Sequence, residues 1–140
     1  MRYLAAGFHN AGGSMFEVSV EYSFAAGHAL RGYKGKCENV HGHNYKVRVT
    51  VEGERLNSIG LLVDFSDLRA ALKGLVERFD HHFLNEVEPF RETNPSAENL
   101  ACYLGNELQR KIKDQGLNVN NVTVWETDTT SASYRPPSVF

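Results

Sequence analysis

The stretch Cys37–Val51 reads CENVHGHNYKVRVTV, and the rest of the chain can be interpreted from it. Side chains two residues apart on a β-strand point to the same face of the sheet. Apolar and polar residues alternate from Tyr45 to Val51, which predicts a half-buried strand. His41 and His43 lie in phase with the apolar face of this strand. Two imidazoles directed at one point suit a divalent metal, zinc above all.

A third imidazole precedes this strand in the chain. Phe16–Phe24, FEVSVEYSF, also alternates apolar and polar residues and predicts a partner strand. His28 follows the end of that strand, so an antiparallel pair would bring it close to His41 and His43. Three imidazoles leave one position of a tetrahedral zinc open, which is typical of catalytic rather than structural sites.

Cys37 adds a thiol to the loop just before the two histidines. Lys34, Lys36 and a nearby metal would all favour the negatively charged thiolate. A thiolate can bind the metal, or it can act as a base or nucleophile. The residues alone leave these two roles open, with an inert loop thiol as the third interpretation.

Two further positions carry candidate chemistry. Asp80 and His81 place a carboxylate beside an imidazole at the end of a predicted helix. This pair is either a proton relay or a histidine favoured by the helix dipole, and we expect the adjacent His82 to be inert.

Glu126 lies in register with apolar strand residues, so its carboxylate needs hydrogen-bond donors. The N–C–N edge of a pterin or guanine would supply two, and the alternative is a strand-end glutamate at the surface.

The remaining periodicities predict two helices and two more strands. The helices start at Asp64 or Ser66 and at Asn94 or Ser96, and they run to Phe79 and to Gly116. The strands cover Val119–Thr127 and a short segment around Tyr134 and Arg135. The order β-β-α-α-β-β predicts an α+β fold, with a four-stranded antiparallel sheet and both helices on one face. The edges of such an open sheet need cover, so we expect oligomerisation through them.

Length and composition indicate the broad class of protein. The 140 residues suit one domain, expected over residues 15–140, and 41% hydrophobic with 23% charged residues is typical of a soluble globular protein. We expect Met1–Ser14 to be a disordered tail or a remnant of cloning. A net charge of −2 gives no reason to expect binding to nucleic acid or to an anionic membrane. Without a secretory signal, the two cysteines favour a reduced, cytoplasmic protein.

Five segments together resemble the 6-pyruvoyltetrahydropterin synthase family. They are FAAGHAL (24–30), CENVHGHNY (37–45), FDHHFLN (79–85), NPSAENLA (94–101) and WETDT (125–129). The likeness covers nearly all of Met15–Arg135. It is closer to the bacterial branch of the family, the 6-carboxy-5,6,7,8-tetrahydropterin synthases of 7-deazaguanine (queuosine) biosynthesis.

The resemblance implies a tunnelling fold (T-fold), in which three subunits close a β-barrel and two trimers form a hexamer with active sites between subunits. It also implies a role for each candidate residue. The implied residues are the zinc ligands His28, His41 and His43, the catalytic base Cys37, the relay Asp80 and His81, and the pterin anchor Glu126.

The implied reaction is that of a zinc-dependent lyase. It converts 7,8-dihydroneopterin triphosphate to 6-carboxy-5,6,7,8-tetrahydropterin and releases acetaldehyde and triphosphate. One alternative is 6-pyruvoyltetrahydropterin synthase activity, which eliminates triphosphate without cleaving the carbon chain. Another is a non-catalytic zinc-binding assembly module. We expect the basic residues Arg31, Lys34 and Lys36 to meet the triphosphate.

Two positions depart from the common family pattern. Gly27 is inserted before His28, which alters the spacing of the first motif. Glu38 follows Cys37, and some family members use a glutamate in this region to yield 6-hydroxymethyldihydropterin. A minor activity of that kind is therefore a further interpretation.

Overall fold

The computed structural model describes residues 13–140. Most of the expected tail, residues 1–12, therefore lies outside the described residues, and the domain boundary stays a prediction. The main elements are β1 (Phe16–His28), β2 (His41–Gly53), α2 (Phe65–Val76), β3 (His82–Phe83), α3 (Ala97–Ile112), β4 (Asn118–Thr127) and β5 (Thr130–Tyr134). Single turns of 3₁₀-helix lie at Lys36–Glu38 (η1), Leu84–Glu86 (η2) and Lys113–Gln115 (η3). Among residues 13–140, no helix is long and apolar enough to cross a membrane.

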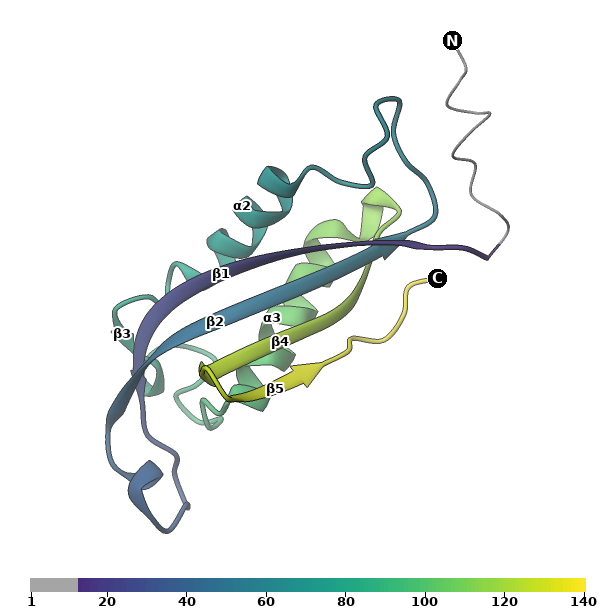
Figure 1. The fold of residues 1–140 in the computed structure, drawn as a ribbon. Coiled ribbons are helices and arrows are strands. Elements are labelled where there is room, and N and C mark those ends of the chain that lie inside the picture. Colours follow the sequence, from purple (N-terminus) through teal and green to yellow (C-terminus); the bar gives the residue numbers. More distant parts are fainter. Residues whose placement is uncertain (1–12) are drawn as a thin grey trace.

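The sheet is built around a long hairpin of β1 and β2 (Figure 1). These strands pair antiparallel over their full length, from Phe16 opposite Gly53 to His28 opposite His41. The strand order is β3-β1-β2-β4-β5, with β4 and β5 added antiparallel beside β2. The hairpin therefore fixes which residues meet at the end of the sheet where β1 stops and β2 starts.

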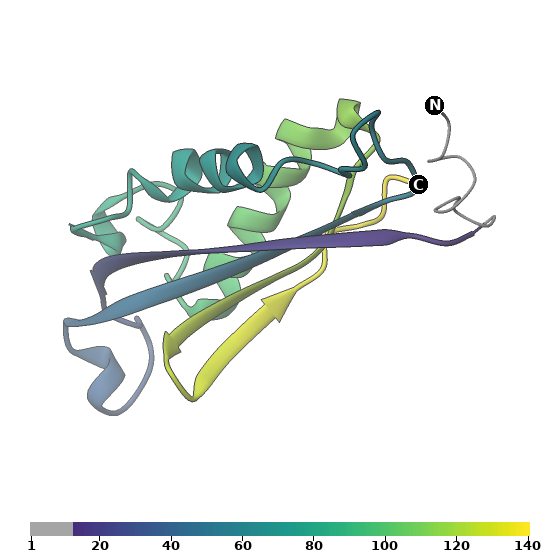
Figure 2. The same cartoon turned by 45° about the horizontal axis from the view of Figure 1, so that its top comes forward.

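Both helices cover the same face of the sheet (Figure 2). The alternating β2 residues Tyr45, Val47, Val49 and Val51 are fully buried there, as the period of two predicts. Helix α2 buries Leu68, Leu72, Leu75 and Val76 against them, and α3 adds Leu100, Leu104, Leu108 and Ile112. The predicted α+β class with two helices on one face is confirmed.

The prediction that the first strand ends at Phe24 is wrong. The apolar alternation stops at Ala25, but the main chain of β1 keeps pairing with β2 as far as His28. A two-residue strand, β3, also pairs in parallel with Ala26 and Gly27. The sheet thus has five strands rather than four, because main-chain hydrogen bonds continue where side-chain periodicity gives no signal.

The two helix starts are fixed by side-chain caps. Asp64 accepts a hydrogen bond from the Ser66 amide (2.7 Å), and Ser96 accepts one from the Asn99 amide (3.1 Å). The alternative caps Ser66 and Asn94 are therefore wrong. Helix α2 also ends at Val76 rather than Phe79, because a tight turn follows it.

Two glycines inside the helices make a matched pair. A methyl group at Gly105 would lie 3.0 Å from the Tyr134 ring and 3.2 Å from Pro136, whereas one at Gly74 would meet only the Lys111 amine, at 3.6 Å. We predict that Gly74→Ala stabilises the protein by about 0.5–1 kcal/mol through helix propensity. Gly105→Ala should destabilise it, since overpacking costs about 1–3 kcal/mol. Urea unfolding measures both, and a more stable Gly105→Ala variant would contradict the packing of α3 on β5.

Candidate metal centre

The hairpin register brings three imidazoles together. His28 lies directly opposite His41, and His43 follows two residues along the same face of β2. The Nε2 atoms of His28 and His41 are 2.9 Å apart. One ring nitrogen from each of the three histidines lies within 4.8 Å of the other two, so the group could hold a metal ion.

The hydrogen bonds on the far side of two rings fix their protonation. His28 Nδ1 lies 2.7 Å from the carbonyl oxygen of Pro95, and His41 Nδ1 lies 2.7 Å from that of Asn39. A carbonyl only accepts, so each Nδ1 donates its hydrogen and each Nε2 faces the other histidine. Either a shared proton or a metal ion between these two Nε2 atoms, 2.9 Å apart, would satisfy both. Tetrahedral zinc holds its nitrogens about 3.4 Å apart, so only a small adjustment is needed.

His43 supplies an independent sign of a missing partner. Its Nε2 is buried and has no hydrogen bond, which is costly for a polar atom. Burial lowers the pKa of His43 and of His28, and the Glu126 carboxylate partly opposes this shift in both. Both rings therefore favour the neutral form, which is the form that binds metals.

Glu126 and Tyr45 lie next to the imidazoles. The Glu126 oxygens lie 3.9 Å from His28 Nε2 and 3.7 Å from His43 Nε2, and 27% of this side chain is exposed. Tyr45 is fully buried, with its ring edge-on to those of His28 and His43. Burial raises the pKa of Tyr45, so its hydroxyl stays protonated. The alternation along the strand predicts Tyr45 only as an apolar strand residue, because strand periodicity does not distinguish a core side chain from one that lines a site.

Cys37 lies beside this group rather than within it. It belongs to η1 and is partly exposed. Within residues 13–140, the group of side chains that could hold a metal ion contains the three histidines and not Cys37. The carbonyl of Cys37 accepts a hydrogen bond from the Leu30 amide (2.8 Å), which ties its loop to the chain after β1.

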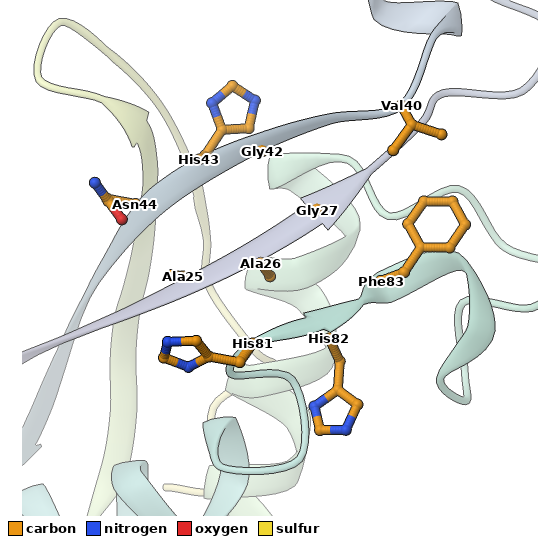
Figure 3. A pocket seen from close by; sticks show the side chains of 10 residues that line it. All are labelled: Ala25, Ala26, Gly27, Val40, Gly42, His43, Asn44, His81, His82 and Phe83. Carbon is orange, nitrogen blue, oxygen red and sulfur yellow. The ribbon is translucent and has the colours of Figure 1, made fainter.

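Asp80 and His81 are held on the outer edge of β1. Asp80 Oδ1 lies 2.9 Å from His81 Nδ1 and also accepts a hydrogen bond from the Ala25 amide (3.0 Å). The His81 ring is 81% exposed, and its backbone is in the left-handed region (φ 61°). His81 and His43 both line an open cavity of about 500 Å³, and β1 lies between β2, which carries His43, and β3, which begins directly after His81 (Figure 3). The adjacent His82 ring bonds instead to the Asp80 carbonyl.

The expected contact of Arg31 with the triphosphate stays a prediction. The Arg31 guanidinium donates to the carbonyl oxygens of Phe90 (2.9 Å), Thr93 (3.4 Å) and Asn85 (3.4 Å). These bonds hold the Arg31 side chain against the segment between β3 and α3. The exposed Lys34 and Lys36 remain available in the same loop.

Comparison with known proteins agrees with this geometry. The family model described as 6-pyruvoyl tetrahydropterin synthase matches residues 17–137. The 6-carboxy-5,6,7,8-tetrahydropterin synthase of Haemophilus influenzae is 34% identical over 86% of this chain and 99% of its own. That of Synechocystis is 34% identical over 88% and 95%. The structure of Caenorhabditis elegans 6-pyruvoyl tetrahydropterin synthase superposes with a TM-score of 0.78 at 28% identity, covering 89% of this chain and 97% of its own. The fold is thus the T-fold of these enzymes.

Removing one imidazole should abolish tight metal binding. We predict that His41→Ala weakens zinc affinity by more than about 100-fold. Loss of a residue that only orients a metal ligand costs up to about 100-fold, and loss of the ligand itself should cost more. His82→Ala is the matched control and should keep one zinc per chain, because the His82 ring bonds to the Asp80 carbonyl and points away from His43 (Figure 3). Zinc titration with metal analysis measures both. Equal stoichiometric binding by wild type and His41→Ala would contradict the three-histidine site.

The buried histidines also predict how the metal-free protein responds to acid. The pKa of His28 and His43 is lowered from 6.5 on folding, so below that pH the unfolded chain binds more protons. Stability is therefore fully present above about pH 6.5 and decreases as the pH falls through that value. Urea midpoints of chelator-treated protein between about pH 8 and pH 5.5 measure this. His43→Gln should flatten the profile and His82→Gln should not, whereas a wild-type midpoint independent of pH would contradict the assignment.

Proposed function

Because the chain belongs to the 6-pyruvoyl tetrahydropterin synthase family of lyases, we propose that it is a 6-carboxy-5,6,7,8-tetrahydropterin synthase. In this proposal it converts 7,8-dihydroneopterin triphosphate and water to 6-carboxy-5,6,7,8-tetrahydropterin, acetaldehyde and triphosphate, as a step of 7-deazaguanine (queuosine) biosynthesis. The observation that carries the proposal is the convergence of three imidazole nitrogens beside a carboxylate. Curated relatives with this activity match over nearly their whole length.

The three histidines would hold zinc through Nε2 of His28 and His41 and a ring nitrogen of His43. Bound there, zinc supplies Lewis acidity that lowers the pKa of the substrate's side-chain hydroxyls. The Pro95 and Asn39 carbonyls keep the ligand rings oriented. The imidazoles thereby fix the place at which the side chain of the substrate is held.

Glu126 would anchor the pterin. Its carboxylate is partly exposed, so a ligand can reach it, and it lies next to the ligand histidines. The N–C–N edge of a pterin offers two donors to one carboxylate, which is a strong, directional pairing. Anchoring the ring at Glu126 would leave its side chain next to the metal site.

Cys37 would move a proton on the substrate side chain, and His81 would act as the second acid–base group. Asp80 supports this role because its carboxylate holds His81 Nδ1 while being fixed to β1. The carbon–carbon bond of the side chain then breaks to release a two-carbon aldehyde. The exposed Lys34 and Lys36, in the same loop as Cys37, would meet the triphosphate.

A homohexamer with active sites between subunits is part of the proposal. Within the described residues, β1 pairs on its outer edge with β3 only at Ala26 and Gly27. Most of this long edge is therefore open to another strand, as is the outer edge of β5. Such pairing would also allow a partner subunit to line the open side of the cavity that contains His43 and His81.

The proposal is tested by incubating the zinc-loaded protein with 7,8-dihydroneopterin triphosphate and identifying the products by mass spectrometry. A 6-carboxypterin together with acetaldehyde is expected. A 6-pyruvoyl product would support instead the activity named for the Caenorhabditis elegans structure. A 6-hydroxymethyl product would indicate the glutamate-type activity suggested by Glu38. No turnover with zinc bound would favour a non-catalytic assembly module.

Substitution of Cys37 distinguishes a catalytic base from a zinc ligand. We predict that Cys37→Ala keeps one zinc per chain and loses activity by about 100-fold or more, the usual contribution of a positioned acid–base group. Cys102→Ala, on α3, is the matched control and should retain activity. Metal analysis and turnover rates measure both variants. A Cys37→Ala protein that loses its zinc would make Cys37 a ligand and refute its role as base.

A further inference from the structure

The main chain that leaves β1 is held by side chains from another part of the protein. In extended chain, the N–H and C=O of one residue point to the same edge, and those of the next residue point to the opposite edge. On the outer edge, Ala25 donates to Asp80 (3.0 Å) and accepts from the His81 amide (2.6 Å). Ala29 lies four residues further on, past the end of β1, and its N–H and C=O point to the same edge.

Two asparagine side chains continue this edge. The Asn85 amide group accepts from the Ala29 N–H (2.9 Å) and donates to the Ala29 carbonyl (2.9 Å). The Asn94 amide group makes the same pair of bonds with Arg31, both at 2.9 Å. Each amide therefore replaces one residue of a neighbouring strand, and both polar groups of alternate residues are satisfied.

The residue between the two clamped ones faces the opposite way. The Leu30 amide donates to the Cys37 carbonyl at 2.8 Å. The Cys37 loop is thus hydrogen-bonded to Leu30. The residues on either side of Leu30, Ala29 and Arg31, are each held by an asparagine side chain. A shift of this segment would carry the Cys37 backbone with it.

The same region of the chain also orients a candidate metal ligand. The carbonyl of Pro95, next to Asn94, bonds to His28 Nδ1 at 2.7 Å. The Asn94 carbonyl accepts from the Asn99 side chain (2.9 Å) in the first turn of α3. The start of α3 therefore holds both the His28 ring and, through Asn94 and Leu30, the loop of Cys37.

From this arrangement we propose that Asn85 and Asn94 are positioning residues that set the place of Cys37 relative to the three imidazoles. The inference rests on the proposed function insofar as Cys37 acts as its base. Neither asparagine has to touch the substrate. Their contribution is to keep the segment Ala29–Arg31 extended, so that the Leu30–Cys37 hydrogen bond fixes the loop. A misplacement of about 1 Å at a reacting group can cost about 100-fold in rate.

The test uses the full-length, zinc-loaded chain with Cys102→Ala, so that Cys37 is the only cysteine left. Asn85→Ala and Asn94→Ala are compared with Asn57→Ala. Asn57 is a matched control, because its side chain also accepts from two backbone amides, those of Ile59 and Leu61, both at 3.0 Å. That turn joins β2 to α2, away from the imidazoles. The readouts are zinc content, hydrogen exchange of the Leu30 amide, iodoacetamide alkylation of Cys37, and the separate values of kcat and KM.

We expect Asn85→Ala and Asn94→Ala to keep one zinc per chain. Each should speed Leu30 exchange by about tenfold or more as the segment opens locally, and change the alkylation rate of Cys37 severalfold. Each should also lower kcat by about tenfold or more while KM changes by less than about threefold. Asn57→Ala should leave all four readouts unchanged. Asn85→Asp and Asn94→Asp keep the accepting oxygen, so they should fold and show smaller changes of the same sign if the alanine variants do not fold.

Three results would overturn the proposal. Unchanged Leu30 exchange and Cys37 alkylation would mean that the asparagines do not hold the loop. A loosened loop with unchanged kcat would mean that the place of Cys37 does not matter. Loss of zinc would make the asparagines part of the metal site instead. If the wild-type protein does not turn over dihydroneopterin triphosphate, the proposed function fails, and the exchange and alkylation results alone decide whether the asparagines position Cys37.

Discussion

The antiparallel pairing of β1 with β2 is the constraint on which the site depends. It sets His28 directly opposite His41 and leaves His43 on the same face. A slip of one residue in this register would turn the histidines and the apolar strand residues to the opposite face. The burial of Tyr45, Val47, Val49 and Val51 under the helices therefore specifies the register. The same hydrophobic packing that stabilises the fold thereby brings the three imidazoles to one point.

The other edge of β1 connects the candidate metal site to the proposed acid–base groups. Asp80, Asn85 and Asn94 all bond through their side chains to the main chain of β1 or of the segment after it. These bonds satisfy backbone groups that would otherwise lack partners, and they place His81 and the Cys37 loop relative to the strand. The carboxylate of Asp80 both fixes the chain and holds the His81 ring. In the proposed function, the residues that stabilise the strand end would also orient the catalytic groups.

Much of this arrangement could be predicted from the sequence, because strand and helix periodicity report burial. The alternation in β1 and β2 predicted the hairpin, and the HxH spacing then predicted imidazoles on one face. The sequence did not predict β3 or the true end of β1, since Ala25 and Gly27 carry no apolar signal and main-chain pairing decides there. Nor did it predict that the Arg31 guanidinium bonds to carbonyls more than fifty residues away in the chain. Contacts of side chains with distant main chain leave no local pattern.

In the proposed site, three imidazoles bind the metal and Cys37 stays off it. X-ray absorption spectroscopy of the zinc-loaded protein tests this most directly, because sulfur and nitrogen ligands differ in distance and scattering. We predict a shell of nitrogen and oxygen atoms at about 2.0–2.1 Å, with the multiple scattering of three imidazoles and no sulfur. A zinc–sulfur shell at about 2.3 Å would contradict the account, since it would make Cys37 a ligand.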